Sequence, residues 1–371
     1  MLNKMRLITM LVTTVTLFGC AEKPTEKPIE SKKESSIENI SPIIKKAPVP
    51  ADYFDMVNWK ITLPADKNKD GKPDEIQGNA LFTFSDPDFF FLDNNNHLVF
   101  EVPNKAVTTK GSTNARSELR QMNRGTATHI GTKDPLNNWA LASHSAADSF
   151  GSIGGHLAAT LKVNHVAKRA GNPDRYPAYS IVVGQIHASK NTAELSRGTG
   201  FGHGNEPLKI FYKKWPNHQT GSVFWTYERN LAKNDPYRTD IAYPVWGNTW
   251  ENSQEPGDDG IALGEVFSYE INVVGNLMNL TFTTEKHNTV KYSIDLSKNK
   301  DAFGHIDTLD FPRAYEQDSF YFKAGAYGQC SVKKGETFWA TACKGTGDLA
   351  IDKKNGDYNS VTFSSITLNG K

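Results

Sequence analysis

The chain contains the run Phe320-Tyr321-Phe322-Lys323-Ala324-Gly325-Ala326-Tyr327-Gly328-Gln329. Because alternate residues of a β-strand point to opposite faces of its sheet, one face of this run is apolar and belongs in a core. The other face carries an ammonium group, two phenols and an amide, and its small Gly325 leaves room above the sheet. A strand that only faces solvent does not need this set of side chains. The run therefore predicts a β-sheet with one functional face.

The same two-residue alternation recurs along most of the chain, and long helical periodicity does not. Gly, Asn, Asp and Pro cluster between the alternating runs, which is typical of turns. We find no repeat of fixed period and no internal linker. These features predict one all-β domain, a sandwich of two antiparallel sheets or a jelly roll. Strands are expected at residues 98–102, 117–122, 156–163, 178–187, 208–212, 223–228, 267–274, 278–285, 290–296, 320–329 and 361–368.

The composition narrows the class of partner. The 371 residues include 42 Lys and Arg against 41 Asp and Glu, for a formal net charge of +1. Nucleic-acid-binding domains usually show a strong cationic excess, so we expect no nucleic-acid partner. The 3 Cys are too few for a disulfide-held scaffold. Binding specificity must therefore lie in local clusters of side chains.

The first residues resemble a bacterial export signal. Lys4 and Arg6 precede an apolar stretch that is much shorter than the roughly 20 residues needed to span a bilayer. The stretch ends at Gly19-Cys20, which resembles a lipobox, where the Cys is diacylated and becomes the mature N-terminus. The alternative is an ordinary signal peptide with an incidental Cys. We expect a lipoprotein signal at residues 1–19 and a bacterial lipoprotein of the outer membrane or cell surface, with a periplasm-facing anchor as the other option.

Residues 20–51 are expected to form a tether behind the lipidated Cys20. This segment is rich in Glu, Lys and Pro and has no aromatic residue, so it cannot bury enough apolar surface to offset its ordering entropy. The folded module is then residues 52–371, and it contacts the membrane only through the lipid anchor. Cys330 and Cys343 of this module are expected to form a disulfide in the oxidising compartment that an exported protein meets, the alternative being two free thiols.

Two further strands carry unusual polar faces. Arg116, Glu118 and Arg120 share one face, so two guanidinium groups flank one carboxylate, an arrangement that suits a carboxylate-bearing ligand. Taken alone, a solvated strand with a surface ion pair is the commoner explanation. Gln185 and His187 end an otherwise apolar strand, for which a buried core histidine is the alternative.

Together the three strands offer Arg, Gln, His, Lys and Tyr, if the sheet brings them side by side. This set suits abstraction of a proton α to a carboxylate, because Arg and amide donors neutralise that carboxylate while charge spreads onto it. A Tyr or His then removes the proton, and an acid protonates the leaving oxygen. Free Tyr titrates at about 10, so a working Tyr needs cationic neighbours for its phenolate. Arg116, Arg120 and Lys323 are the candidates.

Three blocks, in this order, resemble the signature of the alginate lyases of polysaccharide lyase family seven. They are Arg-Ser-Glu-Leu-Arg at 116–120, Gln-Ile-His at 185–187 and Tyr-Phe-Lys-Ala-Gly-x-Tyr-x-Gln at 321–329. Residues 111–115 and 58–64 are also similar to that family. The resemblance covers essentially the whole module. It implies a jelly-roll sandwich with a concave substrate groove that cleaves alginate polymer or oligosaccharides by β-elimination, leaving 4,5-unsaturated uronate ends, with no cofactor for catalysis. We expect a monomer.

The resemblance also implies roles for single residues. Arg116, Gln185 and His187 match the groups around the uronate carboxylate. Tyr327 matches the catalytic acid, and also the base where elimination is syn, whereas His187 would be the base at guluronate, where the proton and leaving oxygen are anti. Ile186 favours guluronate-containing or mixed blocks as substrate. Positions that match supporting or substrate-binding residues are Glu118, Arg120, Tyr321, Lys323 and Gln329.

One residue departs from the family pattern, and two segments leave the mode of cleavage open. Gly328 stands where the block often carries Asn or a larger residue, which alters a subsite. Residues 190–206 and 229–264 are expected to be long loops. They either close one end of the groove and favour exolytic cleavage or form its side walls.

Asp66, Asn68, Asp70 and Asp74 stand at positions 1, 3, 5 and 9 of a loop that is similar to an EF-hand. Position 12 is Gln77 instead of Glu, and we expect no flanking helices, so the loop is not an EF-hand. Two interpretations of this loop remain: it binds a structural calcium ion, or it is a plain acidic turn. The elimination chemistry does not require calcium.

Three rival functions remain. A retaining glycoside hydrolase needs two carboxylates about 5 Å apart, and no predicted strand presents such a pair. A lectin-like module explains the tether and the aromatic face but not the Arg, Gln, His and Tyr set. A lyase on another uronate polymer is the nearest alternative.

Overall fold

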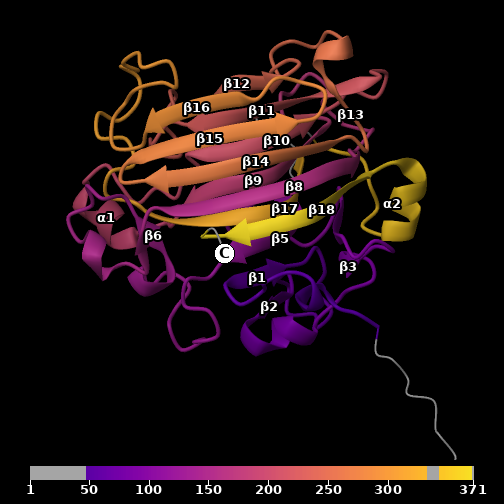
Figure 1. The fold of residues 1–371 in the computed structure, drawn as a ribbon, viewed down its shortest axis with the longest axis horizontal. Helices are drawn as coiled ribbons and strands as arrows, with labels where there is room; N and C mark the ends of the chain where they lie inside the picture. Colours follow the sequence, from indigo (N-terminus) through magenta and orange to yellow (C-terminus); the bar gives the residue numbers. More distant parts are fainter. Residues whose placement is uncertain (1–46, 332–341, 370–371) are drawn as a thin grey trace, which may run out of the picture. The chain divides into compact units, whose positions relative to one another are not determined.

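Two antiparallel β-sheets pack face to face, and each strand predicted from alternation lies in one of them (Figure 1). The computed structural model describes residues 47–331 and 342–369. The predicted signal, Cys20 and most of the predicted tether lie outside the described residues. The residues from Ala47 onward form one compact unit. In the described part of the chain, no helix is both long and apolar enough to cross a membrane.

The larger sheet has eleven strands. Along the chain they are β1 (Trp59–Thr62), β2 (Glu75–Gln77), β5 (Asn114–Gln121), β6 (Trp139–Ala140), β7 (Ser152–Ile153), β9 (Ser180–Ala188), β10 (Leu208–Lys213), β11 (Thr220–Glu228), β12 (Asp240–Trp246), β13 (Ile261–Ala262) and β17 (Ser319–Ser331). The order across the sheet is β12-β11-β10-β9-β17-β5-β1-β2, with β6, β7 and β13 at its margins. The run that opened the sequence analysis is therefore a central strand, β17, between β9 and β5.

The smaller sheet has seven strands in the order β16-β15-β14-β8-β18-β4-β3. They are β3 (Phe90–Leu92), β4 (Leu98–Pro103), β8 (Gly155–His165), β14 (Val266–Val274), β15 (Leu277–Thr284), β16 (Val290–Asp295) and β18 (Tyr358–Leu368). All pairs in both sheets are antiparallel except β6 with β7. The predicted sandwich of two antiparallel sheets is confirmed.

Helices are few and short in the described residues. The α-helices are α1 (Thr192–Arg197) and α2 (Leu349–Asn355), and single 3-10 turns cover Pro50–Asp52, Gly78–Thr83, Pro135–Asn137, Ala147–Ser149 and Gly257–Asp259. The Asn191 side chain accepts the Ala193 and Glu194 amides at the start of α1, and Gly198 ends it in a left-handed conformation. This capped turn shapes the loop between β9 and β10.

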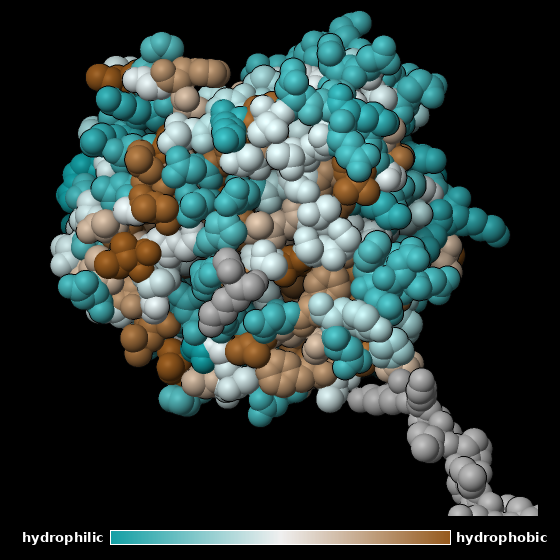
Figure 2. Space-filling view, in the orientation of Figure 1, coloured by the Kyte–Doolittle hydropathy of each residue, from teal (hydrophilic) through white to brown (hydrophobic). Residues whose placement is uncertain are grey.

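The apolar faces of the two sheets meet in one core. Phe320, Phe322, Ala324 and Ala326 of β17 all point into it with no exposed surface. Trp139 stacks on Phe320 with ring centroids 4.6 Å apart. Each large side chain buried in this way stabilises the fold by about 1.5–3 kcal/mol. In the view of Figure 2, hydrophilic residues cover most of the surface and hydrophobic ones are scattered.

Gly325 is needed for a different reason from the one predicted. Its φ is +141°, and a Cβ at this position would lie 2.7 Å from the carbonyl oxygen of Ser117 and 2.9 Å from the Cα of Glu118. The glycine therefore allows β17 to approach the β5 backbone closely. At the far end of β17, Cys330 forms the predicted disulfide with Cys343.

Candidate functional site

The strand register brings the three predicted blocks together. β17 pairs with β5 on one side and with β9 on the other. Their polar residues all lie on the face of the larger sheet that points away from the core, which we call the site face. The facing pairs are Tyr327–Arg116 and Lys323–Arg120 towards β5, and Tyr321–His187 and Lys323–Gln185 towards β9.

Glu118 is the buried centre of this cluster, with a side chain only 2 % exposed. Its Oε2 accepts hydrogen bonds from Arg116 Nη1 at 3.1 Å and from Lys323 Nζ, and its Oε1 accepts one from Gln185 Nε2. Charge-assisted bonds of this kind are stronger than neutral ones and fix the donors in place. Glu118 therefore orients three neighbours, and the alternative of a solvated surface ion pair is wrong.

Two polar atoms of this cluster are buried without a protein partner. Within the described residues, Arg116 Nε and Gln185 Oε1 accept or donate no hydrogen bond. Buried polar atoms are normally satisfied, and a catalytic site is one of the places where unsatisfied ones are kept.

Tyr327 lies beside Arg116 and Ser112. The Arg116 guanidinium is 4.1 Å from the centre of the Tyr327 ring, and Lys323 Nζ is 5.5 Å from it. The phenol oxygen is 3.1 Å from Ser112 Oγ. Burial raises the pKa of Tyr327 above its ordinary value, although the positive charge of Arg116 acts in the opposite direction. Tyr327 is therefore a protonated phenol at neutral pH, which suits a proton donor.

Arg120 lies apart from Tyr327. Its guanidinium is 3.8 Å from the centre of the Tyr321 ring, and it donates to the carbonyl oxygen of Thr132 at 3.0 Å and to Asn138 Oδ1 at 2.9 Å. It thus fixes the segment after β5 and does not support the Tyr327 phenolate as expected. Burial and the Arg116 charge lower the pKa of Lys323 to about 8, against the opposing effect of Glu118.

His187 is held on both sides of its ring. Nδ1 is 2.7 Å from the carbonyl oxygen of Ala188, and Nε2 is 3.2 Å from Glu206 Oε1. The ring stacks on Tyr321 at 5.2 Å. Each ring nitrogen therefore faces an oxygen atom, and the two contacts fix the orientation of the ring. The side chain is 23 % exposed, which rules out a core histidine.

Glu206 is a site residue that the sequence analysis missed. Its second oxygen lies 3.3 Å from Lys209 Nζ, which in turn contacts Asp240 Oδ2 at 2.8 Å. Burial opposes ionisation, but the charges of Lys209 and His187 hold the pKa of Glu206 well below its usual range. Glu206 stands in a loop before Pro207, where no alternation marks the direction of a side chain. Ser112 was missed as a single residue for the same reason.

Gln329 follows Tyr327 on the same face of β17, and its amide donates to the carbonyl oxygen of Tyr327 at 3.4 Å. It therefore lies at the margin of the cluster. Tyr321, at the other margin, is half-buried, and burial raises its pKa.

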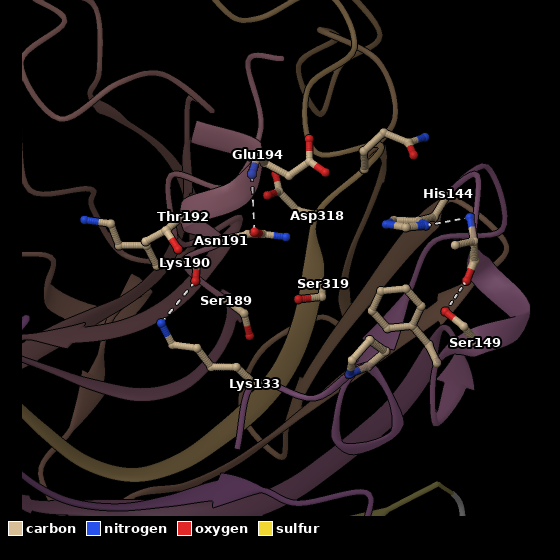
Figure 3. A pocket seen from close by; sticks show the side chains of 14 residues that line it. Lys133, His144, Ser149, Ser189, Lys190, Asn191, Thr192, Glu194, Asp318 and Ser319 are labelled. Carbon is tan, nitrogen blue, oxygen red and sulfur yellow. Dashed lines mark hydrogen bonds between the residues drawn. The ribbon is translucent and has the colours of Figure 1, made fainter. Parts of the chain in front are cut away.

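A pocket of about 340 Å³ adjoins the cluster where β9 ends and β17 begins (Figure 3). Ser189 and Ser319 line it, and they continue the site face two residues beyond His187 and two before Tyr321. Figure 3 shows Lys133 reaching across the pocket, where its Nζ donates to the carbonyl oxygen of Lys190 at 3.2 Å. The volume is in the range of ordinary ligand pockets.

The acidic loop between β1 and β2 turns its oxygens towards its own backbone. Asp66 accepts the amides of Asp70 and Gly71, each at 2.9 Å, and Asp74 accepts the amide of Lys67 at 3.1 Å. Among the residues that the structure describes, no group of three or more His, Cys, Asp or Glu side chains is arranged to hold a metal ion. Calcium at Asp66, Asn68, Asp70 and Asp74 stays a prediction, and no step below uses it.

Comparison with known proteins agrees with the geometry of this site. A family model described as "Alginate lyase" matches residues 54–370. An alginate lyase of Klebsiella pneumoniae is 33 % identical over 299 residues, which is 78 % of this chain and 88 % of the relative. The crystal structure of the alginate lyase from Klebsiella pneumoniae superposes with a TM-score of 0.66 at 29 % identity, covering 86 % of this chain and 98 % of that one.

Two further solved structures are similar. An exolytic family-7 alginate lyase of Zobellia galactanivorans is 34 % identical with a TM-score of 0.68, covering 86 % of this chain and 97 % of that one. A variant of another family-7 alginate lyase, solved with a GGG product, shares the fold at 18 % identity and a TM-score of 0.53, covering 87 % of this chain and 99 % of that one.

Proposed function

This chain belongs to the alginate lyases of polysaccharide lyase family 7, and we propose that the cluster on β5, β9 and β17 is its catalytic centre. One observation carries the assignment of the site: the register places Arg116, Gln185, His187 and Tyr327 on one face around the buried Glu118. The substrate we propose is the guluronate-containing or mixed block of alginate, because Ile186 stands between Gln185 and His187.

Arg116, Gln185 and His187 receive the uronate carboxylate in this proposal. The unsatisfied Arg116 Nε is a donor in the cluster, and Gln185 and His187 lie on the same face of the sheet. Donors that are already fixed in place stabilise the charge that develops on the carboxylate without reorganising. Glu118 contributes indirectly, because it fixes Arg116 and Gln185.

The elimination needs one base and one acid. The base takes the proton from C5, the C5–H electron pair forms the C4=C5 double bond, and the leaving oxygen departs with the electrons of the C4–O bond. Tyr327 gives that oxygen a proton, which agrees with its raised pKa. Where the two groups are syn, Tyr327 also serves as the base. At guluronate His187 is the base in its neutral form, and its Nε2 must first leave Glu206.

Tyr327→Phe should abolish turnover and leave alginate binding largely intact, because only the phenol oxygen is lost. Release of 4,5-unsaturated ends from alginate, followed by ultraviolet absorbance, measures turnover, and calorimetry measures binding. Tyr53→Phe is the matched control, since Tyr53 is 54 % exposed and outside the cluster. An active Tyr327→Phe protein would refute the assigned role. Polyguluronate, polymannuronate and alternating substrates, compared side by side, test the block preference.

A protein that binds alginate without releasing unsaturated ends would instead be lectin-like. Release from another uronate polymer in preference to alginate would favour the nearest alternative, a lyase of different substrate range.

A further inference from the structure

Part of the site face is sealed. The outward-pointing residues of β10, and those of β11 from Ser222 onward, would form the floor of an open groove, yet they are each at most 5 % exposed. On the edge strand β12, Asp240 is 7 % exposed, whereas Ala242 is half-buried and Pro244 is exposed. Within the cluster, Arg116, His187, Tyr321 and Tyr327 are half-buried and reachable. The sealed residues include Lys209, Phe211, Phe224, Thr226, Glu228 and Asp240.

An aromatic side chain covers the apolar part of this floor. Trp250, from the segment between β12 and β13, packs edge-on against Phe211 at 5.2 Å and against Phe224 at 5.5 Å. Tyr176, from the segment between β8 and β9, stacks on Trp250 at 5.8 Å. Tyr327 packs against the same apolar cluster, so the cover begins directly beside the proposed catalytic acid.

A polar network covers the rest of the floor. Arg238, from the loop between β11 and β12, contacts Glu228 Oε1 at 2.6 Å and donates to Asn205 Oδ1 at 3.0 Å. Asn205 in turn donates to the carbonyl oxygen of Leu231 at 2.9 Å. These bonds tie the loop before β10 to the loop after β11, above the sheet. Glu206, the next residue, links the same loop to His187 and Lys209.

We infer that these two covers close the catalytic centre on the side of β10 and β11, so that the enzyme acts on chain ends and releases short products. This inference rests on the proposed function. A polymer lying across the site face would have to pass through Trp250 and Arg238, whereas a chain that ends at Tyr327 and His187 does not reach them. The expected long loops are therefore a barrier across the face as well as walls.

The test compares product size with the number of bonds cut. Viscosity of an alginate solution and ultraviolet absorbance of unsaturated ends are followed together, and early products are sized by mass spectrometry. For the wild-type protein, viscosity should fall slowly relative to the number of new ends, with short products from the first time points. Rapid loss of viscosity with long early products would overturn the inference while leaving the proposed function intact. Absence of unsaturated ends would contradict the proposed function itself, and the inference with it.

Variants of the covers identify the residues responsible. Trp250→Ala and Arg238→Ala should each raise the viscosity loss per new end several-fold and lengthen the early products. Tyr237→Ala is the control, because Tyr237 lies in the same loop as Arg238 with a side chain 53 % exposed, and it should behave as wild type. If Trp250→Ala does not fold, Tyr176→Ala tests the aromatic cover in its place, since Tyr176 lies at the exposed rim of the cover. Folded cover variants with wild-type product sizes would overturn the assignment.

Discussion

At the scale of single residues, carboxylates organise the cations of this site. Glu118 fixes Arg116 and Lys323 from its buried position on the site face, and Glu206 fixes His187 from the loop before β10. A site for an anionic polymer is expected to avoid carboxylates. Here each is balanced by protein cations, because Lys209 contacts the second oxygen of Glu206. The carboxylates thus act on the orientation of the cations more than on the substrate.

Glu206→Gln should lower kcat by at least about tenfold with a smaller change in KM, because His187 loses the charge that orients its Nε2. Steady-state kinetics on polyguluronate measure the effect. Glu270→Gln is the matched control: Glu270 Oε1 contacts His156 Nε2 at 2.8 Å in a similar pair on the smaller sheet, remote from the cluster. Equal kcat values for the two variants would contradict a positioning role for Glu206.

At the scale of elements, the strands that alternate could be predicted and the others could not. In β1 apolar and polar residues alternate over only four positions, Trp59–Thr62, which is the shortest run that can show a two-residue period. β12 contains Pro244, which argues against a strand. β6, β7 and β13 have two residues each, too few to show any period. Strand β17 was predicted correctly because its residues alternate between an apolar face and a polar face along the whole predicted run.

Gly325→Ala should destabilise the protein by roughly 1–3 kcal/mol, because a Cβ with positive φ would press on the β5 backbone. Chemical denaturation monitored by tryptophan fluorescence measures the change. Gly328→Ala on the same strand is the control, since its nearest neighbour would be 3.3 Å away, the Asn359 amide. The explanation fails if the two variants are equally stable.

At the scale of the whole molecule, we propose that the catalytic module works on a lipid tether. The support is the lipobox-like sequence at Gly19-Cys20 and the composition of residues 20–51. A tethered enzyme acts where polymer meets the cell surface, at the outer membrane or facing the periplasm. The near-zero net charge of the chain agrees with cations gathered at one site and balanced elsewhere.

Cys20→Ser should move the lyase activity from the membrane fraction to the soluble fraction of the expressing bacterium. Fatty-acid labelling of the wild-type protein, absent from the variant, reports the modification itself. A Cys20→Ser protein that stays in the membrane fraction would contradict the anchor. The Cys330→Ser variant controls for loss of a cysteine, because Cys330 is bonded to Cys343 within the module.

The amino-acid sequence by itself determined the two-sheet architecture and the strands that carry Arg116, Gln185, His187 and Tyr327, because alternation and short blocks are local properties. Only the tertiary structure decided that Glu118 is buried at the centre of the cluster, that Glu206 holds His187, and that Trp250 and Arg238 cover β10 and β11. Those contacts join segments far apart in the chain through loops, whose side-chain directions follow no period. These contacts are determined by how the loops pack on the sheet.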